Sequence, residues 1–166
     1  MEVIVAVVAT VVAIATYVTW TAGRLDRLHA RVDAAEAALD AQLVCRAVAA
    51  EALPRTLAGG RTEEVRAVAR FARAADPDGR EPAENDLSRV LRHLGLDRES
   101  PQVAELSMAA ARVGLARQFY NDAVRDTRAV RFKPVVRLLR LAGRRPMPAY
   151  FEIDDTGLAA PTRLPR

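Results

Sequence analysis

The feature that most constrains this chain is an uncharged, strongly apolar run close to its N-terminus. From Val3 to Ala22 the sequence reads VIVAVVATVVAIATYVTWTA, so apolar residues cover every face of a helix. About 20 helical residues rise about 30 Å, the thickness of the hydrocarbon core of a bilayer. Threonine hydroxyls in such a run can bond to carbonyls of the same helix. The run predicts a transmembrane helix that contacts membrane lipid through Val3–Ala22.

Two other interpretations of this run were weighed, a cleaved signal peptide and a buried core helix. A signal peptide has a positively charged start and a small-residue cleavage site. The sequence opens Met1-Glu2 and has no convincing Ala-x-Ala before Gly23. A core helix apolar on all sides would need a larger surrounding protein than this chain supplies. A membrane span is therefore favoured.

The residues beside the run predict its orientation. Glu2 precedes the run, and three arginines follow it: Arg24, Arg27 and Arg31. By the positive-inside rule, the side rich in arginine is cytoplasmic. Tyr17 and Trp20 lie near the same end, where amphipathic rings favour the headgroup region. We expect a single-pass cell-membrane protein with its N-terminus outside and its C-terminal domain in the cytoplasm.

Net charge and cysteine content give weaker indications. The charge of +4 and the pI near 10.0 come almost wholly from arginine, since Lys133 is the only lysine. Acidic residues are interspersed with these arginines and no long basic stripe forms, so nucleic acid is not predicted as a partner. The single cysteine, Cys45, cannot form an intramolecular disulfide. Its apolar neighbours predict a buried, inert thiol.

Two long helices are predicted by apolar positions that alternate three and four residues apart. The first, about Arg24–Leu53, continues from the span and ends near Pro54 and Gly59-Gly60. The second, about Ser100–Arg131, begins with Ser100 as N-cap and ends before Lys133-Pro134. Its apolar seam is Val103, Leu106, Ala110, Val113, Arg117, Tyr120, Val124 and Thr127.

Two shorter helices are predicted between the long ones, about Thr62–Ala75 and about Pro82–Leu94. Thr62 is expected to cap the first, residues 76–79 to form a turn, and Gly95 to cap the second. The predicted fold is all-α, an N-terminal transmembrane helix followed by an antiparallel four-helix bundle. The predicted domains are an anchor (1–23), a helical bundle (24–132), and a membrane-proximal amphipathic stretch with a flexible tail (133–166).

A short basic amphipathic stretch, Val135–Arg145, follows the second long helix. Because two antiparallel helices of similar length would return the chain toward the membrane, this stretch is a candidate for contact with the lipid surface. It is equally well interpreted as a short helix that caps the end of the bundle. The sequence leaves both interpretations open.

Two sequence blocks resemble the LemA family. One is Val32-Asp33-x-Ala35-x-x-x-Leu39-Asp40-x-Gln42-Leu43-x-x-Arg46, and the more specific one is the ARQFYNDAV run, Ala116–Val124. Phe132-x-Pro134 and Tyr150-Phe151-Glu152 continue the resemblance, which the stretch Ala47–Pro54 departs from. The resemblance implies a single-span bacterial membrane protein with a long antiparallel helical bundle, and it implies no biochemical role.

No catalytic, cofactor or metal site is predicted. His29 and His93 lie on different predicted helices, and neither has a ligand partner three or four residues away. The chain has no phosphate-binding loop, dinucleotide fingerprint or nucleophile elbow. Asp33, Glu36 and Asp40 are interpreted as a solvated helix face, because di-iron bundles also need Glu-x-x-His pairs.

Polar residues at seam positions are the remaining candidates for a site. Gln42, Arg117 and Tyr120 stand where Val or Leu is expected, and Gln118 and Asn121 are their neighbours. A buried polar group must be hydrogen-bonded, so a network that fixes the helix register is the first interpretation. The second is a polar contact with a partner protein or ligand.

The predicted function is that of a membrane-anchored helical interaction or scaffold protein, not an enzyme. It implies an unidentified protein partner, and self-association is compatible with it. The alternative is a membrane-associated enzyme or small-ligand binder that uses the polar seam residues.

Overall fold

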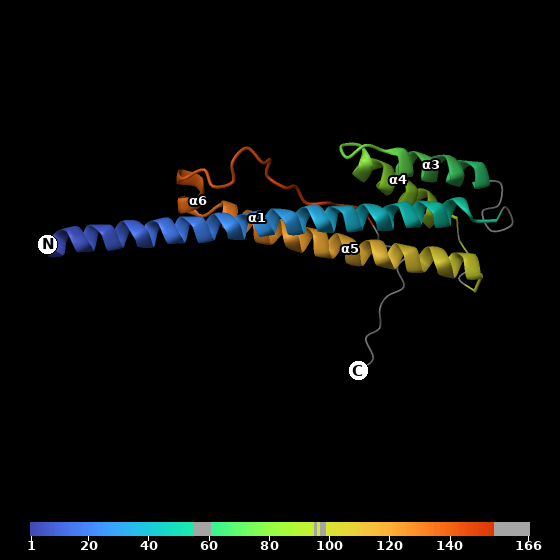
Figure 1. The fold of residues 1–166 in the computed structure, drawn as a ribbon. Helices are drawn as coiled ribbons and strands as arrows, with labels where there is room; N and C mark the ends of the chain where they lie inside the picture. Colours follow the sequence, from blue (N-terminus) through green and yellow to red (C-terminus); the bar gives the residue numbers. More distant parts are fainter. Residues whose placement is uncertain (55–60, 95, 97–98, 155–166) are drawn as a thin grey trace. The chain divides into compact units, whose positions relative to one another are not determined.

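The computed structural model describes residues 1–54, 61–94, 96 and 99–154 (Figure 1), and every regular element within these ranges is helical. The elements are α1 (Glu2–Glu51), α3 (Thr62–Ala74), α4 (Arg80–Arg92), α5 (Pro101–Arg131) and α6 (Pro134–Leu138). The all-α prediction is confirmed for these ranges. The predictions made for Gly59-Gly60, for Gly95 and for the tail beyond Asp154 fall outside the described residues.

The chain forms two compact units, and both long helices contribute to each. Unit 1 comprises Met1–Ala34 and Asn121–Ala149, and unit 2 comprises Ala35–Tyr120 and Tyr150–Arg166. Helix α1 runs through the predicted boundary between anchor and bundle at residue 23, and both long helices run from one unit into the other.

Helix α1 is continuous for 50 residues, as the sequence predicts, and its first part is long and apolar enough to cross a membrane. Its threonines satisfy their hydroxyls within the helix, each donating to the carbonyl four residues earlier: Thr10, Thr16, Thr19 and Thr21. The Arg24 guanidinium lies 5.7 Å from the centroid of the Trp20 ring. The centroids of the Tyr17 and Trp20 rings are 6.5 Å apart. Aromatic and basic groups therefore gather where the apolar run ends.

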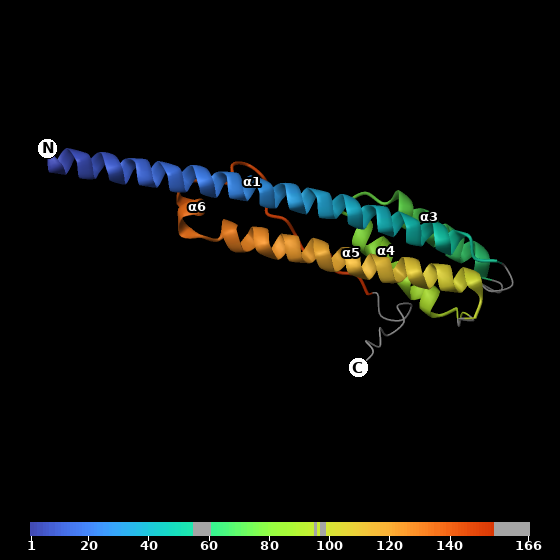
Figure 2. The ribbon, with the colours of Figure 1, turned by 60° about the horizontal axis from the view of Figure 1, so that its bottom comes forward.

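Unit 1 pairs the middle of α1, around residues 25–31, with the end of α5 (Figure 2). Arg31 forms an ion pair with Asp126 at 3.2 Å, and the Thr127 hydroxyl lies 3.4 Å from the Leu28 carbonyl oxygen. Leu28 precedes Arg31 on α1, whereas its partner Thr127 follows Asp126 on α5. The two helices therefore run antiparallel within unit 1. Lys133 is extended before Pro134, which ends α5 as predicted.

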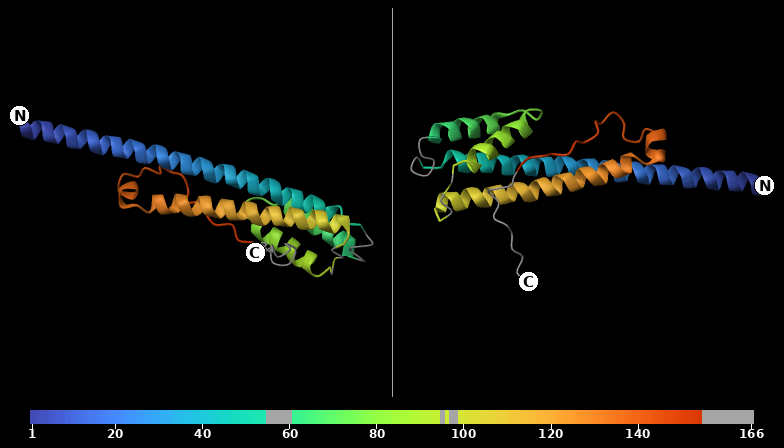
Figure 3. Two further views of the ribbon diagram at one scale, coloured as in Figure 1. Left: turned by 90° about the horizontal axis from the view of Figure 1, so that it is seen from below. Right: turned by 180° about the vertical axis from the view of Figure 1, so that it is seen from behind.

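Unit 2 places α3 and α4 beside the end of α1 and the beginning of α5 (Figure 3). Its larger core is built from Ala47, Ala50 and Leu53 of α1, Val65, Ala69 and Ala72 of α3, Leu87 and Leu91 of α4, and Val103 and Leu106 of α5. The fully buried alanines of α1 have small side chains, which let the short helices approach its backbone closely. One face of each short helix therefore lies in the core.

Residues 150–154 also belong to unit 2, where they are fixed on α4. Ile153 is buried against Leu39, Leu43 and Val113. The Asp154 amide donates to the Asn85 side chain at 2.8 Å, and the Asp154 carboxylate pairs with Arg92 at 2.7 Å. The extended segment thus packs on α1 and α5 through Ile153 and bonds to α4 through Asp154.

Two local predictions were wrong. Thr62 is not the cap of α3 but its buried first residue, and Arg61, which stands at the cap position, pairs with Glu64 instead. Cys45 is exposed, not buried. The inward positions of this part of α1 are taken by Leu43, Arg46 and Ala47, so the apolar character of its neighbours did not indicate which way Cys45 faces.

Candidate functional site

The predicted polar seam residues differ in burial and lie in both units. Gln42, Arg117 and Tyr120 are half-buried in unit 2, Gln118 is exposed there, and Asn121 is a half-buried residue of unit 1. Arg117, Tyr120 and Asn121 each take part in an interaction. These three side chains are neither enclosed, as a buried register network would require, nor fully exposed, as an open contact surface would be.

Tyr120 packs its ring against the cluster formed by Leu39, Leu43, Val113 and Ile153. Burial raises the pKa of its phenol, and the nearby carboxylates Glu36 and Glu81 act in the same direction. The phenol is therefore held in its neutral form, which suits packing and hydrogen bonding rather than catalysis by a phenolate.

Asp40 of α1 forms an ion pair with Arg80 of α4. The Arg80 guanidinium lies 2.6 Å from the Asp40 carboxylate and donates to the Ala72 carbonyl at 3.1 Å. Arg80 thereby connects three helices of unit 2, α1, α3 and α4. The exposed Asp33 and Asp40 confirm a largely solvated acidic face, with one arginine pairing to each.

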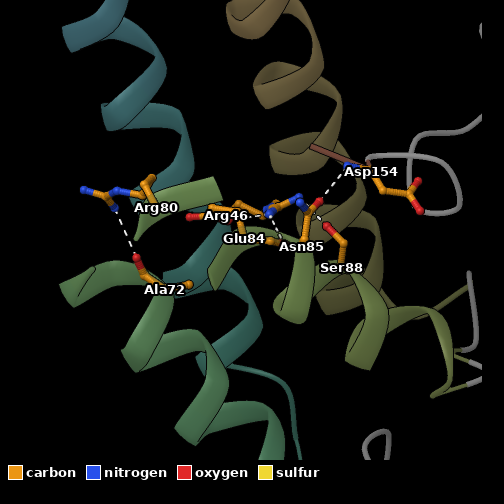
Figure 4. A network of polar contacts seen from close by, with 7 residues as sticks. All are labelled: Arg46, Ala72, Arg80, Glu84, Asn85, Ser88 and Asp154. Atoms are coloured by element: carbon orange, nitrogen blue, oxygen red, sulfur yellow. Dashed lines mark hydrogen bonds and ion pairs between the residues drawn. The ribbon is translucent and has the colours of Figure 1, made fainter. Parts of the chain in front are cut away.

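The most deeply buried polar cluster of the described chain joins α1 to α4 (Figure 4). Arg46 is 1% exposed and Glu84 is 0% exposed, and the guanidinium donates to the carboxylate. Arg46 also donates to the Glu84 main-chain carbonyl and to the Ser88 hydroxyl, both at 3.2 Å. One arginine therefore bonds three oxygens of a single neighbouring helix.

Burial dominates the electrostatics of this pair. It raises the pKa of the Glu84 carboxyl, an effect that Arg46 and then Arg80 oppose. Within the described structure, Arg46 Nε and Glu84 Oε1 have no hydrogen-bond partner. A buried pair of this kind contributes less to stability than its charges suggest, but the loss of either partner leaves a costly buried group.

The arrangement is suited to fixing the register of α4 on α1. Besides their contact with each other, the polar contacts of Arg46 and Glu84 are with the Ser88 hydroxyl and the Glu84 main-chain carbonyl. Among the described residues, no group of three or more His, Cys, Asp or Glu is placed to hold a metal ion.

Sequence reasoning missed this cluster, although a signal was present. Arg46 continues the three-four seam of the first helix four residues beyond Gln42. Glu84 lies three residues before Leu87 on the apolar stripe of α4. Opposite charges at inward positions of two helices could have predicted a buried pair.

A second candidate site is an exposed apolar stripe on α5 within unit 2. Its members recur three or four residues apart on one helix face: Ala104, Met108, Ala111, Leu115 and Phe119. Met108 and Leu115 are each 56% exposed and Phe119 is 64% exposed. This spacing is typical of a surface that packs against another helix. We call it the α5 stripe.

Comparisons with known proteins add no identification, because no protein family, no curated protein and no solved structure matches this chain.

Proposed function

We propose that this protein is a membrane-anchored helical interaction protein. The run Val3–Ala22 of α1 is its transmembrane anchor, with the N-terminus outside and the remaining chain in the cytoplasm. The helices of unit 2, with the paired long helices, form an antiparallel four-helix bundle of the LemA type. The exposed apolar residues of α1 and the arginines that follow them support this assignment.

The α5 stripe is the observation that carries the interaction role. Burying a side chain such as Leu115 or Phe119 contributes about 1.5–3 kcal/mol, so leaving both exposed forgoes appreciable free energy. Alanines alternate with the large residues and allow a close approach of the partner. Glu105 and Arg112 are exposed beside the stripe and supply charges of both signs.

The occupant proposed for the α5 stripe is an amphipathic helix of another protein. A face about 15 residues long, or about 23 Å, matches roughly four turns of such a helix. The partner helix requires apolar residues at the same three-four spacing and charges complementary to Glu105 and Arg112. Two copies of this chain anchored in one membrane would have parallel α5 helices. Each stripe would then meet apolar residues of the other copy, but Glu105 would face Glu105 and Arg112 would face Arg112, so the charges would not be complementary.

A photo-crosslinking amino acid placed at Leu115 tests the interaction role. In cells, it should give one discrete adduct, identifiable by mass spectrometry, which the same amino acid at exposed Arg70 of α3 does not give. Leu115→Asp should remove an adduct formed from Met108. Adducts of twice the chain's own mass would replace the separate partner with a second copy, and an absence of discrete adducts would contradict the proposed role.

Anchoring is tested independently of the partner. The protein should resist alkaline carbonate extraction of membranes, and protease added to intact spheroplasts should spare the chain beyond Gly23. Rapid digestion from outside would reverse the proposed orientation. A shortened soluble form would instead show that the apolar run is cleaved.

A further inference from the structure

The segment 132–144 of unit 1, which we call the α5–α6 corner, exposes an unusual number of large apolar side chains. Leu138 is 83% exposed, and three others are exposed with it: Phe132, Val135 and Leu139. The same segment also has apolar residues that do pack, since Val136 is buried against Leu25 and Val130. The corner is therefore amphipathic, with one apolar set inside the unit and a second set facing outward.

Exposed basic side chains are interspersed along the segment with the outward apolar set. They are Lys133, Arg137, Arg140 and Arg144, all exposed and without an ion pair among the described residues. Arg128 and Arg131 behave differently, because they donate to main-chain carbonyls of the returning segment 145–148. The paired arginines hold the corner in place, and the other cations remain available to an external anion.

The turn that ends α6 places one of these cations in a disfavoured conformation. The Leu141 amide donates to the Val136 carbonyl at 3.0 Å, and the Arg140 amide donates to the Arg137 carbonyl at 3.3 Å. This is a Schellman motif, in which glycine normally occupies the left-handed position. Here Arg140 occupies it, with a φ of 50°. The corner therefore holds an exposed cation on a strained turn.

The position of the corner along α1 indicates what covers it. Leu25, on which Val136 packs, follows Ala22 by less than one helical turn, a rise of about 5 Å. Trp20 is exposed beside this level, with Arg24 over its ring. If Val3–Ala22 spans the bilayer, α6 lies at the depth of the phospholipid headgroups.

We propose that the α5–α6 corner is a second membrane contact that binds anionic phospholipid. Leu138, Leu139 and Phe132 insert at the boundary of the acyl chains, and the four unpaired cations bind headgroup phosphates. Segments with this combination of apolar and basic residues lie in the plane of the interface. The proposal rests on the proposed transmembrane anchor and adds a lipid preference to it.

The experiment measures the depth of the corner in the full chain. Cys45→Ser removes the only cysteine, and Leu138→Cys then takes a polarity-sensitive fluorophore. The protein is reconstituted in phosphatidylcholine vesicles with or without phosphatidylglycerol, each containing a phospholipid with a shallow nitroxide. We expect a blue shift and quenching of the fluorophore, both stronger with the anionic lipid.

Charge-removal variants identify the groups responsible. Each basic residue near an anionic surface favours contact about fivefold. Replacing Lys133, Arg137, Arg140 and Arg144 together by Gln should therefore reduce the quenching to its value in neutral vesicles. Arg70→Gln with Arg89→Gln, which removes two exposed charges of unit 2, should leave it unchanged.

Trp20, the only tryptophan, distinguishes failure of the corner from failure of the anchor. If the nitroxide quenches Trp20 while the Leu138 fluorophore reports water in both vesicles, the lipid contact of the corner is wrong and the anchor stands. If neither is quenched, the anchor itself is wrong. Equal quenching of the Leu138 fluorophore with and without phosphatidylglycerol would overturn the binding of anionic headgroups.

Discussion

Arg46 of α1 and Glu84 of α4 form an ion pair from which water is almost wholly excluded. Each residue stands on the apolar stripe of its helix, so the pair fixes how α4 sits along α1 within unit 2. Sliding either helix by one turn would place both charges against alanine or leucine, where they would be unpaired. We therefore expect the pair to specify the register of unit 2 more than it adds to its stability.

Breaking this pair from one side should be more harmful than replacing both partners. We expect Glu84→Ala to lower the free energy of unfolding by about 3–5 kcal/mol, because it leaves a buried cation. Arg46→Met with Glu84→Met should restore much of the loss. Thermal melts of the full chain in detergent, monitored by circular dichroism, rank the parent and the two variants by stability. A double variant as unstable as Glu84→Ala would show that the pair is a large net source of stability.

The raised pKa of Glu84 predicts how stability changes with pH. Between the unfolded value of 4.5 and the higher folded value, the folded state binds more protons than the unfolded state. The contribution of Glu84 to stability is thus complete below pH 4.5 and is lost as the pH rises through the folded pKa. Glu84→Gln should remove this dependence, so the stability of the parent relative to the variant should fall with rising pH. A difference that grows with pH would reverse the sign.

His29 should produce the opposite dependence in unit 1. Burial and then the charge of Arg131, whose guanidinium lies 3.4 Å from His29 Nε2, lower the pKa of the imidazole. The unfolded state therefore binds more protons just below pH 6.5, and stability is lost as the pH falls from this value through the folded pKa. His29→Gln should make the melting temperature depend less on pH between about pH 5 and 7, the range in which histidine titrates. The exposed His93→Gln is the control and should retain the slope of the parent.

Tyr120 should contribute through its ring more than through its hydroxyl. Full burial of an aromatic ring would make truncation to alanine cost about 3–5 kcal/mol. Since Tyr120 is only half-buried, we expect Tyr120→Ala to cost about half as much, roughly 1.5–2.5 kcal/mol. Tyr120→Phe keeps the ring and should cost about 0.5–1.5 kcal/mol. Melts that rank Tyr120→Phe as the more harmful variant would assign the residue to a polar network instead.

Cys45 should react as an exposed thiol in the folded protein. A thiol-specific reagent such as a maleimide should label it in detergent without denaturant, at a rate within about tenfold of an unstructured thiol. Labelling that requires denaturant would contradict the exposed position of this residue on α1.

Local sequence signals determined the helices of this protein. Solid apolarity over Val3–Ala22, three-four spacing after it, Asp76–Gly79 as a turn and the extended residue before Pro134 are all encoded within a few neighbouring residues. Each acts through steric limits or hydrogen bonds of the local backbone, so the sequence alone is sufficient to predict it. The same signals placed Val103, Leu106 and Val113 correctly on the inner face of α5.

Only the tertiary structure decided which polar residues are buried and which apolar residues are exposed. Arg46 is enclosed because Glu84 and Ser88 of α4 reach it from 38 and 42 residues away in sequence, and no local pattern encodes that meeting. Leu138 and Phe119 are exposed although their residue types favour burial. Periodicity defines a face of a helix, but the neighbouring elements determine whether that face is covered, and their arrival depends on contacts distant in sequence.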